Sequence, residues 1–170
     1  MKTLVLALPG NEAFASSLAM ASDGELGQLE TRHFPDGESL VRLATSVAGR
    51  PVIFVCSLYQ PDAKILPLLF SAATARELGA QSIGLVAPYL AYMRQDQRFH
   101  PGEAVTSLIF GRLLSQPIDW LVTVDPHLHR HPSLEAVYQV HATALHAAPH
   151  IAAWIREHVK DPVLIGPDSE

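Results

Sequence analysis

The chain has 170 residues, a length that fits one domain and is sufficient to bury a sizeable core. Apolar residues make up 48% of it and charged residues only 17%, which excludes an intrinsically disordered protein. The net charge of -5 argues against non-specific binding to nucleic acid, so an anionic ligand would need a local cluster of positive side chains.

The chain has a single cysteine, Cys56, so a disulfide framework is impossible and a reducing cytoplasm is indicated. No signal-peptide pattern opens the sequence, and no uninterrupted apolar stretch reaches the ~18 residues of a membrane span. We therefore expect a soluble, cytoplasmic protein that has no membrane partner.

Five short apolar runs without polar alternation are typical of strands buried on both faces of a sheet. In chain order they cover residues 3–9, 51–58, 82–90, 119–125 and 162–166. Helical patterns cover residues 61–79, 104–114 and 144–159, where Pro67 and Pro149 are expected to kink or shorten two of the helices. This alternation predicts an α/β fold, with a three-layer, mostly parallel sheet flanked by helices.

The segment 29–43 departs from this alternation. Two extended arms surround a Pro-Asp-Gly turn at 35–37, which predicts a protruding β hairpin or flap. The aromatic Phe34 lies beside the acids Asp36 and Glu38 at this turn. Such acids can accept hydrogen bonds from an adenine amino group while the ring stacks on the base. An ordinary hairpin turn with Phe34 in the core is the alternative interpretation.

The block RQDQR at 94–98 follows the third apolar run, at the carboxyl end of a predicted strand, where open α/β sheets bind ligands. The guanidinium of Arg94 can stack on a base through its plane and can bind phosphate oxygens through its fork. Gln95 and Asp96 add an amide and a carboxylate. A solvated loop with a surface ion pair is the alternative interpretation of this block.

Three histidines alternate after the run at 119–125, namely His127, His129 and His131. On an extended segment this spacing would put their imidazoles on one side, which would suit zinc. One histidine that assists a magnesium site is a second interpretation, and solvent-exposed histidines without a ligand are a third.

Several motifs of other enzyme classes are absent. The sequence contains no GxxxxGK[ST] loop and no GxGxxG, so neither a P-loop nor the dinucleotide fingerprint is present. It also contains no GxSxG elbow, and Cys56 lies within an apolar run without an obvious base.

Taken in order, five motifs resemble those of the ribose-phosphate pyrophosphokinase (PRPP synthetase) family, in its archaeal-like variants. They are GN at 10–11, FPDGES at 34–39, PYLAYMRQDQRF at 88–99, VDPH at 124–127 and PD at 167–168. The resemblance covers the whole chain and implies a phosphoribosyltransferase-like fold. It also implies an enzyme that uses Mg²⁺ to transfer pyrophosphate from ATP to ribose 5-phosphate, giving PRPP and AMP.

The same resemblance implies a role for each candidate residue. The residues that it implies for ATP binding are Phe34, Asp36, Glu38, Arg94, Gln95 and Asp96. The residues that it implies for magnesium are His127 and Asp168. In the family, the flap that carries Phe34 contacts the ATP of a neighbouring subunit, which implies a homo-oligomer. Positioning and charge neutralisation dominate such transfer chemistry.

Family members are about twice as long as this chain, so residues 1–170 correspond to the N-terminal, ATP-binding domain. The C-terminal domain, which binds ribose 5-phosphate, and the catalytic lysine are expected beyond Glu170, so we expect no activity from this chain alone. Three segments depart from the family pattern: Pro126 replaces a Leu, QRFHPGE at 97–103 replaces a basic run, and GPDSE replaces PDxGG.

Two other interpretations are open. One is a non-catalytic relative that keeps the fold as a regulatory or structural subunit. The other is a phosphoribosyltransferase, which shares the general fold but requires a PRPP-binding loop that this sequence lacks.

Overall fold

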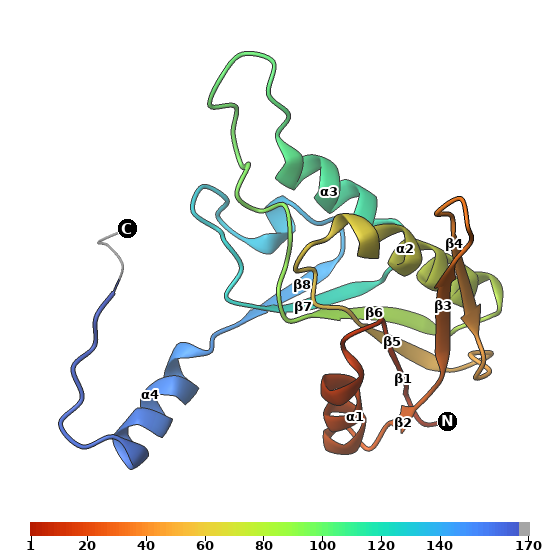
Figure 1. Cartoon of the computed structure of the whole chain (residues 1–170), viewed down its shortest axis with the longest axis horizontal. Coiled ribbons are helices and arrows are strands. Elements are labelled where there is room, and N and C mark those ends of the chain that lie inside the picture. The colour runs from red at the N-terminus through yellow and green to blue at the C-terminus, as the bar shows by residue number, and fades with distance from the viewer. Residues whose placement is uncertain (167–170) are drawn as a thin grey trace.

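The computed structural model describes residues 1–166, and its centre is a six-stranded parallel sheet (Figure 1). The strands of this sheet are β1 (Leu4–Ala7), β2 (Glu25–Leu26), β5 (Pro51–Val55), β6 (Ser82–Ala87), β7 (Trp120–Val124) and β8 (His141–Leu145). The other elements are α1 (Glu12–Ala21), β3 (Leu29–His33), β4 (Ser39–Leu43), α2 (Asp62–Glu77), α3 (Thr106–Ser115), the short 3₁₀ helix η1 (Leu134–Ala136) and α4 (Ala148–His158).

Helices cover both faces of the sheet, as the alternating pattern predicted. On one face, Ala15 and Ala19 of α1 pack against Val5 and Val55, and their small side chains let the helix approach the strands closely. The larger core lies on the other face, beneath α2 and α3 (Figure 1). Its helical residues include Leu68, Ala72, Ala75, Phe110 and Leu114. Within residues 1–166, no helix is long and apolar enough to cross a membrane.

The strand order is β2-β1-β5-β6-β7-β8, so the chain adds β2 on one side of β1 and the strands from β5 to β8 on the other. This reversal of direction makes the gap between β1 and β5 the switch point of the sheet, a common ligand site in open α/β folds. Here Asn11 lies at that point and is nearly fully buried. Its Oδ1 accepts a hydrogen bond from the Ser57 amide at 2.8 Å, and its Nδ2 donates to the Leu8 carbonyl at 3.1 Å. Asn11 therefore ties the loops after β1 and β5 together.

The predicted hairpin at 29–43 is confirmed. β3 and β4 pair in antiparallel register, form a separate two-stranded sheet and pack against α2. The turn is closed by the Phe34 amide, which donates to the Glu38 carbonyl at 2.8 Å, and by the Gly37 amide, which donates to the Phe34 carbonyl at 2.9 Å. Gly37 has a φ of 91°, a left-handed value that side chains disfavour.

Two predictions for the last part of the chain are wrong. The expected helix at 144–159 begins only at Ala148, because residues 141–145 instead form β8 and pair with β7. Pro149 lies in the first turn of α4, where its missing N–H costs no hydrogen bond. The expected strand at 162–166 is irregular, and Val163, Leu164 and Ile165 are exposed. Apolar side chains do not make a strand where no neighbouring strand supplies backbone partners.

The proline inside α2 has less effect than the sequence predicted. The helix runs as one element from Asp62 to Glu77, with Pro67 in its second turn. The Pro67 carbonyl accepts a hydrogen bond from the Ser71 hydroxyl at 2.7 Å. Pro67 is also buried against the core, so tertiary packing offsets part of the cost of its missing N–H.

We expect Cys56 to be unreactive in the folded protein. Its side chain is fully buried just after β5, and this burial raises the pKa of the thiol to about 11. At pH 8 only about one thiol in a thousand would be ionised, and the thiolate is the nucleophile. Labelling with a thiol-specific reagent should therefore be slow in buffer and fast in denaturant. Fast labelling of the native chain would contradict the burial of Cys56.

Candidate functional site

A cavity of about 730 Å³ lies at the carboxyl ends of the neighbouring strands β6 and β7. The loops that follow these two strands form its walls, so the residues that face each other come from separate parts of the chain. Arg94 and Gln95 contribute from the loop after β6, and Asp125, His127 and His129 contribute from the loop after β7. The structure thus brings three of the predicted site residues, Arg94, Gln95 and His127, to one cavity.

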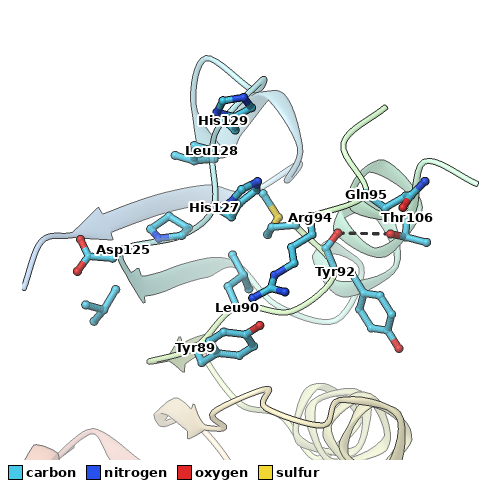
Figure 2. Close-up of a pocket in the computed structure, with 13 residues that line it drawn as sticks. Tyr89, Leu90, Tyr92, Arg94, Gln95, Thr106, Asp125, His127, Leu128 and His129 are labelled. Atoms are coloured by element: carbon cyan, nitrogen blue, oxygen red, sulfur yellow. Dashed lines mark hydrogen bonds between the residues drawn. The ribbon is translucent and has the colours of Figure 1, made fainter. Parts of the chain in front are cut away.

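Arg94 is exposed and extends from its loop toward the ring of Tyr89 (Figure 2). Gln95 is held more firmly, because its Nε2 donates to Glu103 Oε2 at 2.9 Å. The same Glu103 oxygen accepts hydrogen bonds from the amides of Phe99 at 2.9 Å and His100 at 3.0 Å. One carboxylate therefore fixes the curve of the loop that presents Arg94 and Gln95.

Asp96 occupies a different environment from its two neighbours in sequence. Its side chain is 0% exposed, and both carboxylate oxygens accept from Nη1 of Arg130, at 3.1 and 3.3 Å. Arg130 belongs to the loop after β7, whereas Asp96 belongs to the loop after β6. The carboxylate of Asp96 thus faces Arg130, and Asp96 does not line the cavity.

The three alternating histidines do not share one side of their segment, so that expectation is wrong. His127 and His129 line the cavity, with ring centroids 6.0 Å apart. His131 turns away, and its Nε2 lies 3.0 Å from the hydroxyl of the buried Ser107. Among residues 1–166, no group of three or more His, Cys, Asp or Glu side chains is arranged to hold a metal ion. This arrangement removes the three-histidine zinc interpretation.

The predicted flap residues lie apart from this cavity. Phe34, Asp36 and Glu38 are at the tip of the β3–β4 hairpin, which Figure 1 shows well separated from the loop between β6 and α3. Phe34 is 39% exposed, so it is not in the core, and the Arg32 guanidinium lies 4.8 Å from its ring centroid. Asp36 Oδ1 accepts a hydrogen bond from the Glu38 amide at 3.2 Å. The remaining candidate, Asp168, lies outside the described residues.

Besides Tyr89, the cavity residues that the sequence did not predict include Tyr92 and Asp125. Both have left-handed backbones, with φ values of 59° and 41°, and such values are uncommon outside glycine. The Tyr92 hydroxyl donates a hydrogen bond to the Asp62 carboxylate, and this bond, with some desolvation, raises the pKa of Tyr92. Asp125 Oδ1 lies 3.2 Å from His146 Nδ1. The position of Asp125, at the carboxyl end of the predicted strand 119–125, was the available signal for it.

The layered α/β architecture and its cavity at the strand ends define a phosphoribosyltransferase-like fold, which confirms the predicted class. The structure is similar to the crystal structure of phosphoribosylpyrophosphate synthetase from Mycobacterium smegmatis, with a TM-score of 0.83 and 22% sequence identity. That similarity covers 93% of this chain and 53% of the other. Residues 3–116 match the family described as the N-terminal domain of ribose phosphate pyrophosphokinase, and the chain belongs to this family.

Archaeal proteins named ribose-phosphate pyrophosphokinase are similar over most of the chain, as the motifs predicted. The protein of Halobacterium salinarum is 35% identical over 97% of this chain and 57% of its own length. The protein of Methanopyrus kandleri is 36% identical over 97% of this chain and 56% of its own length. The chain therefore spans a little more than half the length of these relatives.

Proposed function

We propose that this chain is the ATP-binding, N-terminal half of a ribose-phosphate diphosphokinase. The full-length enzyme would transfer pyrophosphate from ATP to ribose 5-phosphate, giving PRPP and AMP. The observation that carries the proposal is the meeting of Arg94, Gln95 and His127 at one cavity, in a chain that belongs to this family. We also propose a cytoplasmic location, which a single, buried and free cysteine supports.

The cavity has the size and the chemistry that a nucleotide needs. Its volume of about 730 Å³ falls within the range of roughly 300–1,000 Å³ that is typical of small-molecule sites. Tyr89 and Arg94 offer flat groups on which adenine can stack, and the fork of Arg94 can also bind phosphate oxygens. Gln95, held by Glu103, offers an amide oxygen as an additional polar contact. We assign adenine and the adjacent phosphates to this side of the cavity.

The residues present also fit a magnesium ion. Mg²⁺ prefers oxygen ligands, keeps several waters, and is bound in such sites by one or two carboxylates together with substrate phosphates. The Asp125 carboxylate and the His127 imidazole line the same cavity and would hold the ion or its waters, with the predicted Asp168 as a further ligand. When bound, Mg²⁺ would neutralise phosphate charge, which is its usual part in phosphoryl transfer.

We further propose that the protein is a homo-oligomer. Within one chain, the hairpin tip with Phe34, Asp36 and Glu38 is well separated from the loop that carries Arg94 (Figure 1). If these tip residues contact ATP, as the family resemblance implies, the nucleotide must belong to a neighbouring copy. Multi-angle light scattering of the full-length protein should then show association that increases with protein concentration. A strict monomer at all concentrations would contradict this arrangement.

The experiment that tests the proposed function is calorimetric titration of ATP into the chain, in buffer containing Mg²⁺. We expect saturable binding at one site per chain, with ATP preferred to ribose 5-phosphate. Absence of ATP binding would refute the proposal and would favour the alternative, a non-catalytic regulatory or structural subunit.

The chain alone should not make PRPP, because the ribose 5-phosphate site and the catalytic lysine are expected in the other half of the protein. We expect no release of AMP that depends on ribose 5-phosphate when the purified chain is incubated with both substrates and Mg²⁺. The control is the same assay with the full-length protein. Substrate-dependent AMP from the chain alone would disprove the assignment of these functions to the missing half.

A further inference from the structure

The two loops that form the cavity are joined by an ion pair. Asp96 belongs to the loop after β6, Arg130 belongs to the loop after β7, and the two side chains are 34 positions apart in sequence. The Asp96 carboxylate is 0% exposed and the Arg130 guanidinium 41% exposed. Within residues 1–166, Arg130 is the only ion-pair partner of this buried carboxylate. A buried charge without a partner is strongly unfavourable, so the pair constrains where both loops can lie.

Further contacts connect the Asp96–Arg130 ion pair to other residues of the loop that carries Arg94. The Arg130 guanidinium lies 5.4 Å from the ring centroid of Phe99. The Phe99 amide donates to Glu103, the same carboxylate that holds the Gln95 side chain. A displacement of Arg130 would therefore change the position of Gln95 as well as that of Asp96.

A second contact joins the loop after β7 to the start of α3. His131, next to Arg130, has its Nε2 3.0 Å from the hydroxyl of the buried Ser107 at the start of α3. The Ser107 amide in turn donates to the Gln95 carbonyl at 3.3 Å. The neighbouring residues Arg130 and His131 thus contact Asp96 in the other loop and Ser107 in the helix that follows it.

From these contacts we infer that Arg130 is a positioning residue for nucleotide binding. It holds the loop of Arg94 and Gln95 and the loop of His127 in one fixed arrangement. Asp96 serves nucleotide binding through Arg130 and does not contact the ligand itself. This inference rests on the proposed function for its ligand, and it adds a role for Arg130 that the motifs did not indicate.

The test is a double-mutant cycle on ATP affinity, measured by calorimetry with the chain in Mg²⁺. Arg130→Gln should weaken ATP binding about tenfold, a mid-range effect for coupled residues. In an Arg94→Ala background the same change should cost clearly less than in the wild-type background, because one of the residues that it positions is already absent. The matched control is Arg76→Gln, which breaks another Arg–Asp pair, with Asp119 at 2.7 Å, and should leave ATP affinity unchanged.

A second variant guards against loss of folding. Arg130→Gln leaves the Asp96 charge buried alone, whereas Arg130→Gln combined with Asp96→Asn removes both charges together. The double variant should fold, should bind ATP about as weakly as Arg130→Gln, and should show the same dependence on Arg94. Equal losses in the presence and absence of Arg94 would overturn the positioning role and indicate a purely structural one.

A readout without ligand separates this inference from the proposed function. Hydrogen–deuterium exchange of the ligand-free double variant should become faster in both loops, 94–105 and 125–131, and remain unchanged in α1. Faster exchange in 125–131 alone would overturn the inference, whatever the chain binds. The wild-type chain could fail to bind ATP while the double variant shows faster exchange in both loops. That result would refute the proposed function but would still support the conclusion that Arg130 holds the two loops together.

Discussion

Replacing Arg94 with alanine in the full-length protein is expected to lower kcat/KM for ATP by at least about thirtyfold. Loss of the guanidinium plane over adenine should cost ~0.5–2 kcal/mol. Loss of a charge-assisted hydrogen bond to phosphate should cost a further ~1.5–3 kcal/mol. Because ~1.4 kcal/mol corresponds to a tenfold change, even the lower sum gives about the stated factor. Steady-state kinetics with varied ATP and saturating ribose 5-phosphate measure the effect, and the kinetics of ribose 5-phosphate should change far less.

Two further variants make this result specific. Arg94→Lys should not restore ATP use, because lysine keeps the charge but lacks the plane and the fork. Arg98→Ala removes an exposed arginine from the same loop that does not line the cavity, so it should behave like the wild type. A near-normal kcat/KM for Arg94→Ala would remove this loop from the ATP site and favour the solvated-loop interpretation.

Gly111→Ala should lower the free energy of unfolding by about 2 kcal/mol, although alanine normally stabilises a helix. A Cβ atom at Gly111 would lie 2.4 Å from the carbonyl oxygen of Val137, a backbone atom that cannot rotate away. Such overpacking costs ~1–3 kcal/mol, and more where neighbours cannot move. The gain in helix propensity is at most about 1 kcal/mol, so the clash should decide the sign.

Urea unfolding followed by circular dichroism measures this change. The control is Ser17→Ala, which also places alanine in a helix but at an exposed position of α1. Its effect should stay within about 0.5 kcal/mol. A Gly111→Ala protein as stable as the wild type would show that α3 does not pack on the Val137 backbone as closely as described.

The sequence predicted secondary structure best for the strands that are buried on both faces of the sheet. Strands β1, β5, β6 and β7 were each predicted, because central parallel strands are apolar on both faces. The strand β8 was missed because HATAL at 141–145 has the composition of a helix, and its pairing with β7 decides its conformation. Helix α1 was missed too, since its buried face consists of the small residues Ala15 and Ala19, which give a weak apolar pattern.

The candidate site was likewise predictable only in part. The sequence placed Arg94, Gln95 and His127 after predicted strands, and the structure shows that these two strands are adjacent and that the three residues line one cavity. The pairing of Asp96 with Arg130 could not be predicted, because nothing local in the sequence links residues 34 positions apart. The ATP-binding and metal-binding roles themselves stay predictions.

The left-handed backbones of Tyr92 and Asp125 have a consequence for laboratory evolution. Such conformations cost of order 1–3 kcal/mol for an ordinary side chain, and less for aspartate, so a library screened only for heat resistance should select glycine or asparagine at these positions. Those replacements would remove the phenol that meets Asp62 and the carboxylate beside His127. Thermostability and ligand binding would then change in opposite directions at the same two codons. Libraries intended to preserve ligand binding should therefore hold positions 92 and 125 fixed and vary the rest.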